Sequence, residues 1–403
     1  MNALRALCAA AALLALGAPA AQAQSAERPP AAPGAQAAIV IDARNGDVMF
    51  ARQETQRRQM ASTTKLMTAL LTLENERPGA VFTAADYAAA PVESQIGLRP
   101  GERMTVRDLL KALLLESAND AAVTLAEGIS GTRDAFVAAM NARAEELGLD
   151  DTSYANPVGF DDPLNYSTAR DLATLARDLM AHPRFARVVD MPVAELESGA
   201  RPRVIDNRNT LIAAYPFVDG VKTGHTLQAG YVLIGAAEKG AGAKVISVVM
   251  GEPSEPARDA DTLALLRWGL DRFRRARVVR KGRAMADAAI EYRDEEAALV
   301  PARNVAVTVR EGEKVRRRVN APEQLEGPLD AGTRVGSVTV LVEGERVRRV
   351  ALVTAASIPE AGTLRVFVSE VGVPLTVLLA LAVLVGAVLV AMRLRVRLRV
   401  VKR

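Results

Sequence analysis

Apolar residues recur along this chain with two different periods, one of three to four residues, which is typical of helices, and one of two residues, which is typical of strands. Between Ser62 and about Met191, apolar residues recur every three or four positions, as in LATLARDLMAHPRFARVV, which predicts helices. Strand-like runs stand on both sides of this stretch: IVIDARNGDVMFAR before it, and VDGVKTG, AGYVLIGAAEKG and AKVISVVMGE after it. The helical segment DTLALLRWGLDRF follows the last strand. Strands at both ends with helices between them predict one antiparallel sheet with an inserted helical lobe, an α+β fold.

The first strand-like run carries a turn signal of its own. Asn45-Gly46 lies between two apolar segments, and this pair favours the type I′ turn of a two-residue β-hairpin. We therefore expect the first two strands to be neighbours in the sheet.

In residues 276–361 the hydrophobic pattern has the strand period of two residues. NVAVTVREGEKVRRRV and GSVTVLVEGERVRRVALVTA alternate apolar and polar residues across Glu-Gly turns, which predicts a small all-β domain. This segment has no motif that suggests catalysis. We interpret it as a stalk between the preceding domain, residues 37–275, and the C-terminus; a binding module is the alternative.

Both ends of the chain carry membrane signals. Residues 1–23 combine Arg5, the apolar run LCAAAALLAL and the small-residue site Ala21-Gln-Ala23, as a secretory signal peptide does. Residues 371–392 are 22 residues without a charge, long enough to cross a bilayer as one transmembrane helix. Six cations follow in residues 393–403, which predicts a basic cytoplasmic tail. We expect a single-pass membrane protein whose domains lie on the extracytoplasmic side, preceded by a disordered linker in the Pro/Ala-rich residues 24–36.

Charge and cysteine content exclude several classes of function. The formal net charge is +4, but without the tail and Arg5 it is −3, so no basic patch suggests a nucleic-acid partner. Cys8, the one cysteine, lies in the predicted signal peptide, so the mature chain should have neither disulfides nor a cysteine nucleophile. The chain has two histidines, His182 and His225, which argues against a Ser-His-Asp triad and against a zinc site.

Three short motifs carry the candidate chemistry: Ser62-Thr-Thr-Lys65, Ser117-Ala-Asn119 and Lys222-Thr-Gly224. On a helix, residues i and i+3 share a face, so the side chains of Ser62 and Lys65 could meet. A serine hydroxyl needs a base to become a nucleophile, and a lysine can serve when burial or another cation lowers its pKa. Each motif alone is common by chance. Their order, about 50 and 100 residues apart, matches the S-x-x-K, S-x-N and K-T-G set of the penicillin-binding proteins and class A β-lactamases.

The likeness extends from about residue 37 to residue 275 and is most specific in KTGHT and AGY. Over this range the chain resembles the low-molecular-mass D-alanyl-D-alanine carboxypeptidases, which are penicillin-binding proteins of the S11 peptidase type. The resemblance implies a β-lactamase/transpeptidase-like fold. A site between the helical lobe and the sheet edge would suit an extended peptide, which could add to the strand that carries the third motif.

The resemblance also implies roles for the motif residues. Ser62 would be the nucleophile, Lys65 its base, and Ser117 the relay that carries a proton to the leaving amine. Asn119 would hold the peptide amide of the substrate. The backbone N–H groups of Ser62 and His225 would form the oxyanion hole.

The other residues that the resemblance implies would bind the substrate carboxylate, set the charge around the base or make room for the ligand. Lys222 would repel the charged form of the base and would attract the C-terminal carboxylate of the substrate, which Thr223 would also bind. Gly224 would let its strand approach the ligand closely. Arg208 and Arg258 match arginines that the family places near the site.

The implied function is a serine-type D-Ala-D-Ala carboxypeptidase that removes the terminal D-alanine from peptidoglycan stem pentapeptides through an acyl-enzyme. It would need neither metal nor organic cofactor, and β-lactam antibiotics would inhibit it. A D,D-endopeptidase and a β-lactamase remain alternatives, because Asp161-Asp-Pro-Leu-Asn165 approaches the E-x-x-L-N pattern of class A β-lactamases, with aspartate for glutamate. A wall-binding protein with a degenerate site is a further alternative, which the three intact motifs disfavour.

Overall fold

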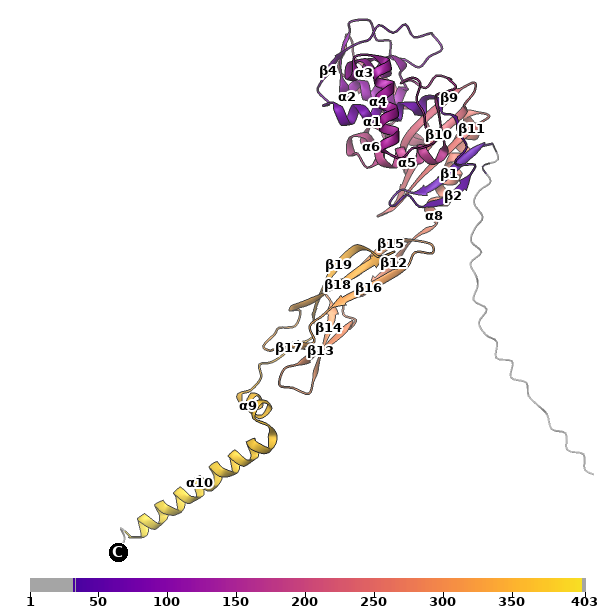
Figure 1. Cartoon of the computed structure of the whole chain (residues 1–403). Helices are drawn as coiled ribbons and strands as arrows, with labels where there is room; N and C mark the ends of the chain where they lie inside the picture. The colour runs from indigo at the N-terminus through magenta and orange to yellow at the C-terminus, as the bar shows by residue number, and fades with distance from the viewer. Residues whose placement is uncertain (1–31, 33, 401–403) are drawn as a thin grey trace, which may run out of the picture.

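The structure, a computed structural model, describes residue 32 and residues 34–400, without the side chains of residues 395–400. The predicted signal peptide and most of the predicted linker lie outside these residues. Figure 1 shows three successive parts: a domain of helices and sheet, a smaller domain of strands, and a long C-terminal helix. This order confirms the fold class that the hydrophobic pattern predicts.

A five-stranded antiparallel sheet forms the centre of the first domain. Its strands lie in the order β2 (Val48–Arg52), β1 (Ala37–Asp42), β11 (Ala243–Glu252), β10 (Gly230–Lys239) and β9 (Val218–Thr226). The first and last segments of the domain therefore meet in one sheet, as the sequence predicts. β9, which carries the third motif, is an edge strand of this sheet.

Helices cover both faces of the sheet. α8 (Glu255–Asp271) packs against β10 and β11, and α5 (Ala169–Met180) packs against β1 and β11 from the other side. Because neighbouring residues of a strand point to opposite faces, both faces of β1 are used. Ile39 packs into the core shared with the helical lobe, and Val40 packs into the core beneath α8. Every residue of β1 is consequently buried.

The helical lobe is inserted between β2 and β9. Besides α5 it contains α1 (Lys65–Asn75), α2 (Val106–Lys111), α3 (Asn119–Ser130), α4 (Arg133–Glu146), α6 (Pro183–Val189) and α7 (Leu211–Ala214). Two-stranded ribbons stand among the helices: β3 (Arg58–Gln59) with β6 (Tyr166–Ser167), β4 (Val81–Thr83) with β5 (Arg103–Thr105), and β7 (Val193–Leu196) with β8 (Arg203–Asp206). Threonines define several helix starts, because the side chains of Thr105, Thr132 and Thr168 each accept a hydrogen bond from the N–H three residues later.

β1 and β2 form the predicted hairpin, but the predicted type I′ turn is wrong. That turn requires positive φ at both central residues, whereas of the pair only Gly46 has it, with φ of +83°. The chain closes a wider loop instead, in which Gly46 N–H donates to Asp42 O over 2.8 Å and Asp42 N–H donates to Asp47 O over 2.9 Å. Asn45 stabilises this loop through its side chain, whose Oδ1 accepts from Asp47 N–H at 3.1 Å.

The end of the predicted linker is packed rather than disordered. Ala32 and Ala35 are 2% and 1% exposed and belong to the core beneath α8. Gln36 N–H donates to Met250 O over 2.9 Å, next to the pairing of β1 with β11. Alanine side chains are small enough to fill gaps at the edge of a core, so the packed chain extends upstream of residue 37.

The second domain is all-β, as the alternation predicts. Its larger sheet has the order β16 (Val315–Asn320), β18 (Arg334–Val342), β19 (Glu345–Thr354), β14 (Glu296–Pro301), β13 (Ala286–Ile290) and β17 (Gln324–Leu325), and β12 (Phe273–Val279) pairs with β15 (Val305–Arg310). A separate apolar core lies within it. Because β12 begins at Phe273, we propose that this domain begins there rather than at residue 276.

Polar contacts join the second domain to one end of the main sheet. Arg44, in the β1–β2 loop, forms a 2.7 Å ion pair with Glu313. Thr308 of β15 donates its hydroxyl to the carbonyl oxygen of Ala241, in the β10–β11 turn, over 2.5 Å. The third motif lies toward the other end of the sheet, where β9 pairs with the beginning of β10.

The C-terminal helix is interrupted before its apolar part. α9 (Thr363–Val371) ends at Gly372, which has φ of +85°, and α10 (Val373–Val400) follows it. Val373–Leu394 is long and apolar enough to span a membrane, and none of it is buried inside the described structure. α10 therefore begins two residues after the start of the predicted transmembrane segment, 371–392, because the glycine breaks the helix.

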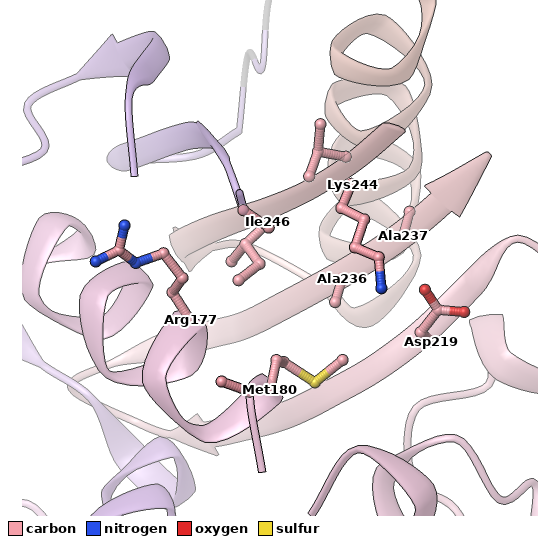
Figure 2. A pocket seen from close by; sticks show the side chains of 10 residues that line it. Arg177, Met180, Asp219, Ala236, Ala237, Lys244 and Ile246 are labelled. Atoms are coloured by element: carbon pink, nitrogen blue, oxygen red, sulfur yellow. The ribbon is translucent and has the colours of Figure 1, made fainter. Parts of the chain in front are cut away.

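A cavity of about 200 Å³ lies between α5 and the sheet, at the end remote from the third motif. Figure 2 shows Met180 and Arg177 on the helix and Asp219, Ala236 and Lys244 on the strands around it. Short alanine side chains leave this space open. None of the predicted site residues lines it.

Candidate active site

Ser62 and Lys65 lie at the start of the first helix of the lobe. A 3₁₀ turn, η1 (Ala61–Thr64), leads directly into α1, so the two side chains lie on one side of the chain. Lys65 Nζ is 3.0 Å from Ser62 Oγ and 2.6 Å from the carbonyl oxygen of Val158. The structure thus brings into hydrogen-bond contact the two residues that the sequence predicts as nucleophile and base.

The Lys65 side chain is fully buried, and this changes its acid–base behaviour. Burial, together with the nearby positive charge of Lys222, holds the pKa of Lys65 well below its usual value of 10.5. The carboxylates of Glu93 and Asp120 act in the opposite direction. Lys65 therefore loses its proton at a lower pH than an ordinary lysine, as a general base must.

Ser117 stands at an abrupt change in helical geometry. α2 continues as a π-helical turn, η2 (Ala112–Glu116), and Ser117 then adopts left-handed backbone angles, with φ of 64° and ψ of 29°. Serine enters this region at a cost in energy, and such residues cluster at functional sites. Ser117 is 5% exposed, and both η2 and α3 pack against α1. The second motif is thereby placed against the helix that begins with Lys65.

Asn119 has a partner that sequence reasoning missed. Its Nδ2 donates to Glu93 Oε2 over 2.8 Å. Glu93 comes from the loop between β4 and β5, where no period or motif distinguishes it from an ordinary solvated glutamate. Another missed contribution is the carbonyl of Val158, a backbone group that no side-chain motif could reveal.

The third motif lies on β9, which packs against η1. The side chains of Lys222 and Thr223 are buried, at 1% and 8% exposed. Burial, reinforced by the positive charges of Arg208 and Arg258, lowers the pKa of Lys222 to about 7. A bound carboxylate would oppose these effects, so Lys222 would hold its proton more firmly when an anionic ligand arrives.

Two glycines enclose the backbone of Ser62. A Cβ atom on Gly224 would lie 3.1 Å from Ser62 N, and one on Gly159 would lie 2.9 Å from the same atom. Gly159 also has φ of +95°, which side chains rarely allow. β9 therefore approaches the Ser62 backbone closely at Gly224, and the predicted role of this glycine toward a ligand stays a prediction.

The two histidines lie on different elements. His225, at the exposed end of β9, stacks on Tyr231 of β10 with ring centroids 4.0 Å apart. His182 lies between α5 and α6, and its Nε2 is 4.0 Å from Asp178. Within the described part of the chain, no group of three or more His, Cys, Asp or Glu side chains is placed to hold a metal ion.

Asp161, the residue that approaches the glutamate of class A β-lactamases, is tied to the end of β9. Its Oδ1 accepts from Thr226 Oγ1 at 2.5 Å and its Oδ2 accepts from Gln228 N–H at 3.3 Å. Both oxygens are thus used in holding the loop to the strand. This arrangement gives Asp161 a positional role and disfavours the β-lactamase alternative.

The two arginines approach the site differently. Arg208 pairs with Glu116, the residue before Ser117, with Nε 3.1 Å from Oε1. Arg258 is buried on α8, where its guanidinium pairs with two carboxylates of that helix at 2.8 Å. Both act on Lys222 through their charge.

Comparison with known proteins agrees with this geometry. Residues 22–254 match the family model described as D-alanyl-D-alanine carboxypeptidase, peptidase S11, and residues 273–360 match the C-terminal domain of penicillin-binding protein 5. The D-alanyl-D-alanine carboxypeptidase DacF of Bacillus subtilis (strain 168) is 31% identical over 321 residues, which are 77% of this chain and 82% of that protein. DacB2 of Mycobacterium tuberculosis (strain H37Rv) is 38% identical over 240 residues, 58% of this chain and 82% of that protein. The solved penicillin binding protein 5 from Haemophilus influenzae aligns with a TM-score of 0.58 and 29% identity over 81% of this chain and 98% of its own. This chain therefore belongs to the D-alanyl-D-alanine carboxypeptidase family, peptidase S11, a family of serine hydrolases.

Proposed function

We propose that this protein removes the terminal D-alanine from peptidoglycan stem pentapeptides through an acyl-enzyme on Ser62. The observation that carries the proposal is the fully buried Lys65, whose Nζ lies 3.0 Å from Ser62 Oγ and whose pKa is held well below its usual value. The family identifies the D-alanyl-D-alanine bond as the target, and this pair of side chains supplies a nucleophile with its base.

Acylation would begin when Ser62 Oγ attacks the carbonyl carbon of the penultimate D-alanine and passes its proton to Lys65. Negative charge would develop on the carbonyl oxygen, toward which the N–H groups of Ser62 and His225 would donate. Ser117 would relay the proton from Lys65 to the nitrogen of the terminal D-alanine. The C–N bond would then break, D-alanine would leave, and an ester would remain on Ser62.

Substrate binding would use the edge of the sheet. β9 is an edge strand, so an extended stem peptide would lie beside it and add main-chain hydrogen bonds. Lys222 and Thr223 would bind the C-terminal carboxylate, and Asn119 would hold a peptide amide. Arg208 would add positive charge around the carboxylate site, because its charge already acts on Lys222.

Deacylation would return the enzyme to its starting state. After the first half-reaction Lys65 is neutral again, and we assign to it the activation of the water that attacks the ester. The water oxygen would bond to the acyl carbon, the bond to Ser62 Oγ would break, and the proton would return to that oxygen. A β-lactam would form the same kind of ester with Ser62.

The proposal includes a location. α10 would anchor the protein in the cell membrane, and the predicted signal peptide, residues 1–23, would direct both folded domains to the extracytoplasmic side. The all-β domain would then separate the active site from the bilayer, because it lies between the two along the chain.

One set of measurements tests this function. The purified chain is treated with benzylpenicillin and digested, and mass spectrometry should place the adduct on the peptide that contains Ser62. Ser62→Ala should give no adduct and no release of D-alanine from diacetyl-Lys-D-Ala-D-Ala. An adduct on Ser117 or Ser167 would contradict the assignment. Cleavage of cross-linked muropeptides in place of D-alanine release would make the protein an endopeptidase.

A further inference from the structure

The loop between β4 and β5 places a carboxylate beside the second motif. Glu93 Oε2 accepts from Asn119 Nδ2 at 2.8 Å, and its Oε1 accepts from Ala90 N–H at 2.9 Å. The hydroxyl of Tyr87 also donates to Glu93 Oε2. Although burial acts to raise it, these hydrogen bonds lower the pKa of Glu93, so the carboxylate is ionised at neutral pH.

Tyr87 is itself held in place. The guanidinium of Arg133 lies over its ring, 5.4 Å from the centroid, and pairs with Glu127 at 2.8 Å. Arg133 also donates to the carbonyl oxygen of Asp86 at 3.2 Å. A chain of contacts therefore runs from α3 and α4 through Tyr87 to Glu93.

The same loop is fastened to the beginning of α3. Asn119 N–H donates to the carbonyl oxygen of Ser94 over 2.8 Å. The carboxylate of Asp120 accepts from the N–H groups of Ile96, at 3.2 Å, and Leu98, at 2.9 Å. Glu93 thus stands on a segment whose backbone is fixed on the side that faces α3.

This arrangement constrains the Asn119 side chain. A carboxylate can only accept hydrogen bonds, so Glu93 must face the NH₂ end of the amide and not its carbonyl oxygen. The NH₂ end of the amide is thereby fixed toward Glu93, so Oδ1 is the acceptor at its other end. Without Glu93, the amide could rotate and present either end to a substrate.

Glu93 also acts on Lys65 through its charge. The charges that act on the pKa of Lys65 are those of Lys222 on β9, Asp120 on α3 and Glu93 on the loop. Lys222 opposes the charged form of Lys65, and the two carboxylates favour it.

We propose that Glu93 is a positioning residue of the peptidase: held by Tyr87, it fixes the orientation of the Asn119 amide and places a negative charge toward Lys65. The inference rests on the proposed function, because it assigns Asn119 and Lys65 their roles in acylation. Glu93 therefore affects two quantities that can be separated, the binding geometry of the substrate amide and the pH at which Lys65 becomes neutral.

The two effects are separated by two substitutions in the full-length protein. Glu93→Gln keeps an acceptor for Asn119 but removes the charge, and Glu93→Ala removes both. The rate of acylation, kcat/KM, is measured from pH 5 to pH 9 with benzylpenicillin and with the tripeptide. Glu74→Gln is the matched control, because Glu74 pairs with Arg143 on the surface of the lobe. Thermal unfolding of every variant verifies that it is folded.

We expect the Glu93 substitutions to change the acidic limb and the plateau of the kcat/KM profile in different ways. Loss of the charge lowers the pKa of Lys65, so the acidic limb should move to lower pH in both Glu93 variants. Glu93→Ala should also lower the plateau of kcat/KM for the tripeptide about 10- to 100-fold, as expected for a misplaced binding group. Glu93→Gln should retain most of the plateau, and Tyr87→Phe should fall between the two without displacing the limb.

Two outcomes would overturn the inference. Profiles of both Glu93 variants that coincide with the wild-type profile would remove any role for Glu93. The second outcome is that both variants lose the same fraction of kcat/KM at every pH and the acidic limb is not displaced. Glu93 would then have only a structural role. The Ser62 adduct is measured on the same samples. If the wild-type protein forms no adduct on Ser62, the proposed function is wrong, and the role of Glu93 is wrong with it. If the wild-type protein forms the adduct, any difference in the Glu93 variants tests the role of Glu93 alone.

Discussion

The surroundings of Lys65 favour its neutral form, which the proposed role as a base requires. The largest cause of its lowered pKa is burial, and repulsion from Lys222 adds to it. The carbonyl oxygen of Val158 accepts one of its hydrogens at 2.6 Å, which holds Nζ on the side of Ser62. The side chain therefore lies in position to accept the Ser62 proton, and its lowered pKa favours the neutral form that proton abstraction requires.

We expect Lys65→Arg to lose at least about 100-fold in the rate of penicillin acylation, because a guanidinium keeps its proton and cannot act as a base. The rate is measured by stopped-flow or by labelling with a fluorescent penicillin. Lys239→Arg is the control, since Lys239 is exposed on the sheet and pairs with Asp271. A Lys65→Arg protein that acylates at the wild-type rate would transfer the role of base to another group.

Lys222→Ala should lower kcat/KM for the tripeptide by about 10²- to 10³-fold, through loss of electrostatic stabilisation at the carboxylate. Lys244→Ala, on β11, provides a comparison that removes a lysine far along the sheet. If the Lys222 variant stays within about twofold of wild type, corresponding to well under 1 kcal/mol, this lysine does not act on the substrate.

A site residue could be predicted from the sequence when its contacts are local along the chain. Ser62 and Lys65 are three positions apart on one helix, so their contact follows from local geometry, although their roles stay predictions. Glu93 and Val158 reach the site from loops, where position depends on the tertiary path of the chain. A backbone carbonyl such as that of Val158 is present in every residue, so no sequence signal could single it out.

At the scale of elements, β9 combines the third motif with a destabilising carboxylate. Burial, followed by repulsion from Asp190 and Glu238, raises the pKa of Asp219 to about 6, and Lys244 opposes the shift. Asp219 faces the cavity shown in Figure 2. Because its folded pKa lies above the unfolded value of 3.8, ionisation of Asp219 opposes folding. The penalty grows as pH rises from about 4 and is complete above about 6.

Asp219→Asn should therefore stabilise the first domain near pH 7.5 and leave it unchanged near pH 4. After allowance for solvent screening the gain is about 1 kcal/mol, which corresponds to a rise in Tm of about 2–4 °C. Thermal unfolding at the two pH values measures it, with the exposed Asp206→Asn as control. A gain of equal size at both pH values would show that charge is not its cause.

The periodic elements were predictable, and the irregular ones were not. β9, β10 and β11 follow from alternation and apolar runs, since two covered faces demand apolar residues on both. The π-helical turn before Ser117 and the wide loop around Gly46 depend on local hydrogen bonds that the hydrophobic period does not record. The packing of Ala32 was hidden because a Pro/Ala-rich composition predicts flexibility, whereas a small side chain can also fill a gap in a core.

In the molecule as a whole, the all-β domain separates the first domain from the apolar helix α10 (Figure 1). The contacts between the two domains, such as Arg44 with Glu313, lie at the end of the sheet remote from the third motif. The site is therefore built entirely within the first domain, and the rest of the chain determines where that domain stands.

Removal of residues 369–403 should release a soluble protein that keeps full activity on the tripeptide. The reason is that α10 makes no buried contact with the domains. The full-length protein should stay with membranes through a high-salt wash, because apolar burial, unlike attraction to lipid charge, is not screened by salt. Release by salt alone would show that the helix lies on the surface of the bilayer.

The glycines around Ser62 bear on how this enzyme could escape an antibiotic. A Cβ atom at residue 159 or 224 would lie within about 3 Å of the backbone nitrogen of Ser62, the proposed nucleophile. A mutation of either glycine cannot exclude a β-lactam and still admit the natural peptide, because both must reach the hydroxyl of Ser62. A population selected for growth under penicillin should therefore acquire changes elsewhere, on the rim of the cleft or in the abundance of the protein. These two codons should remain invariant in every surviving lineage that still trims its cell wall with this enzyme.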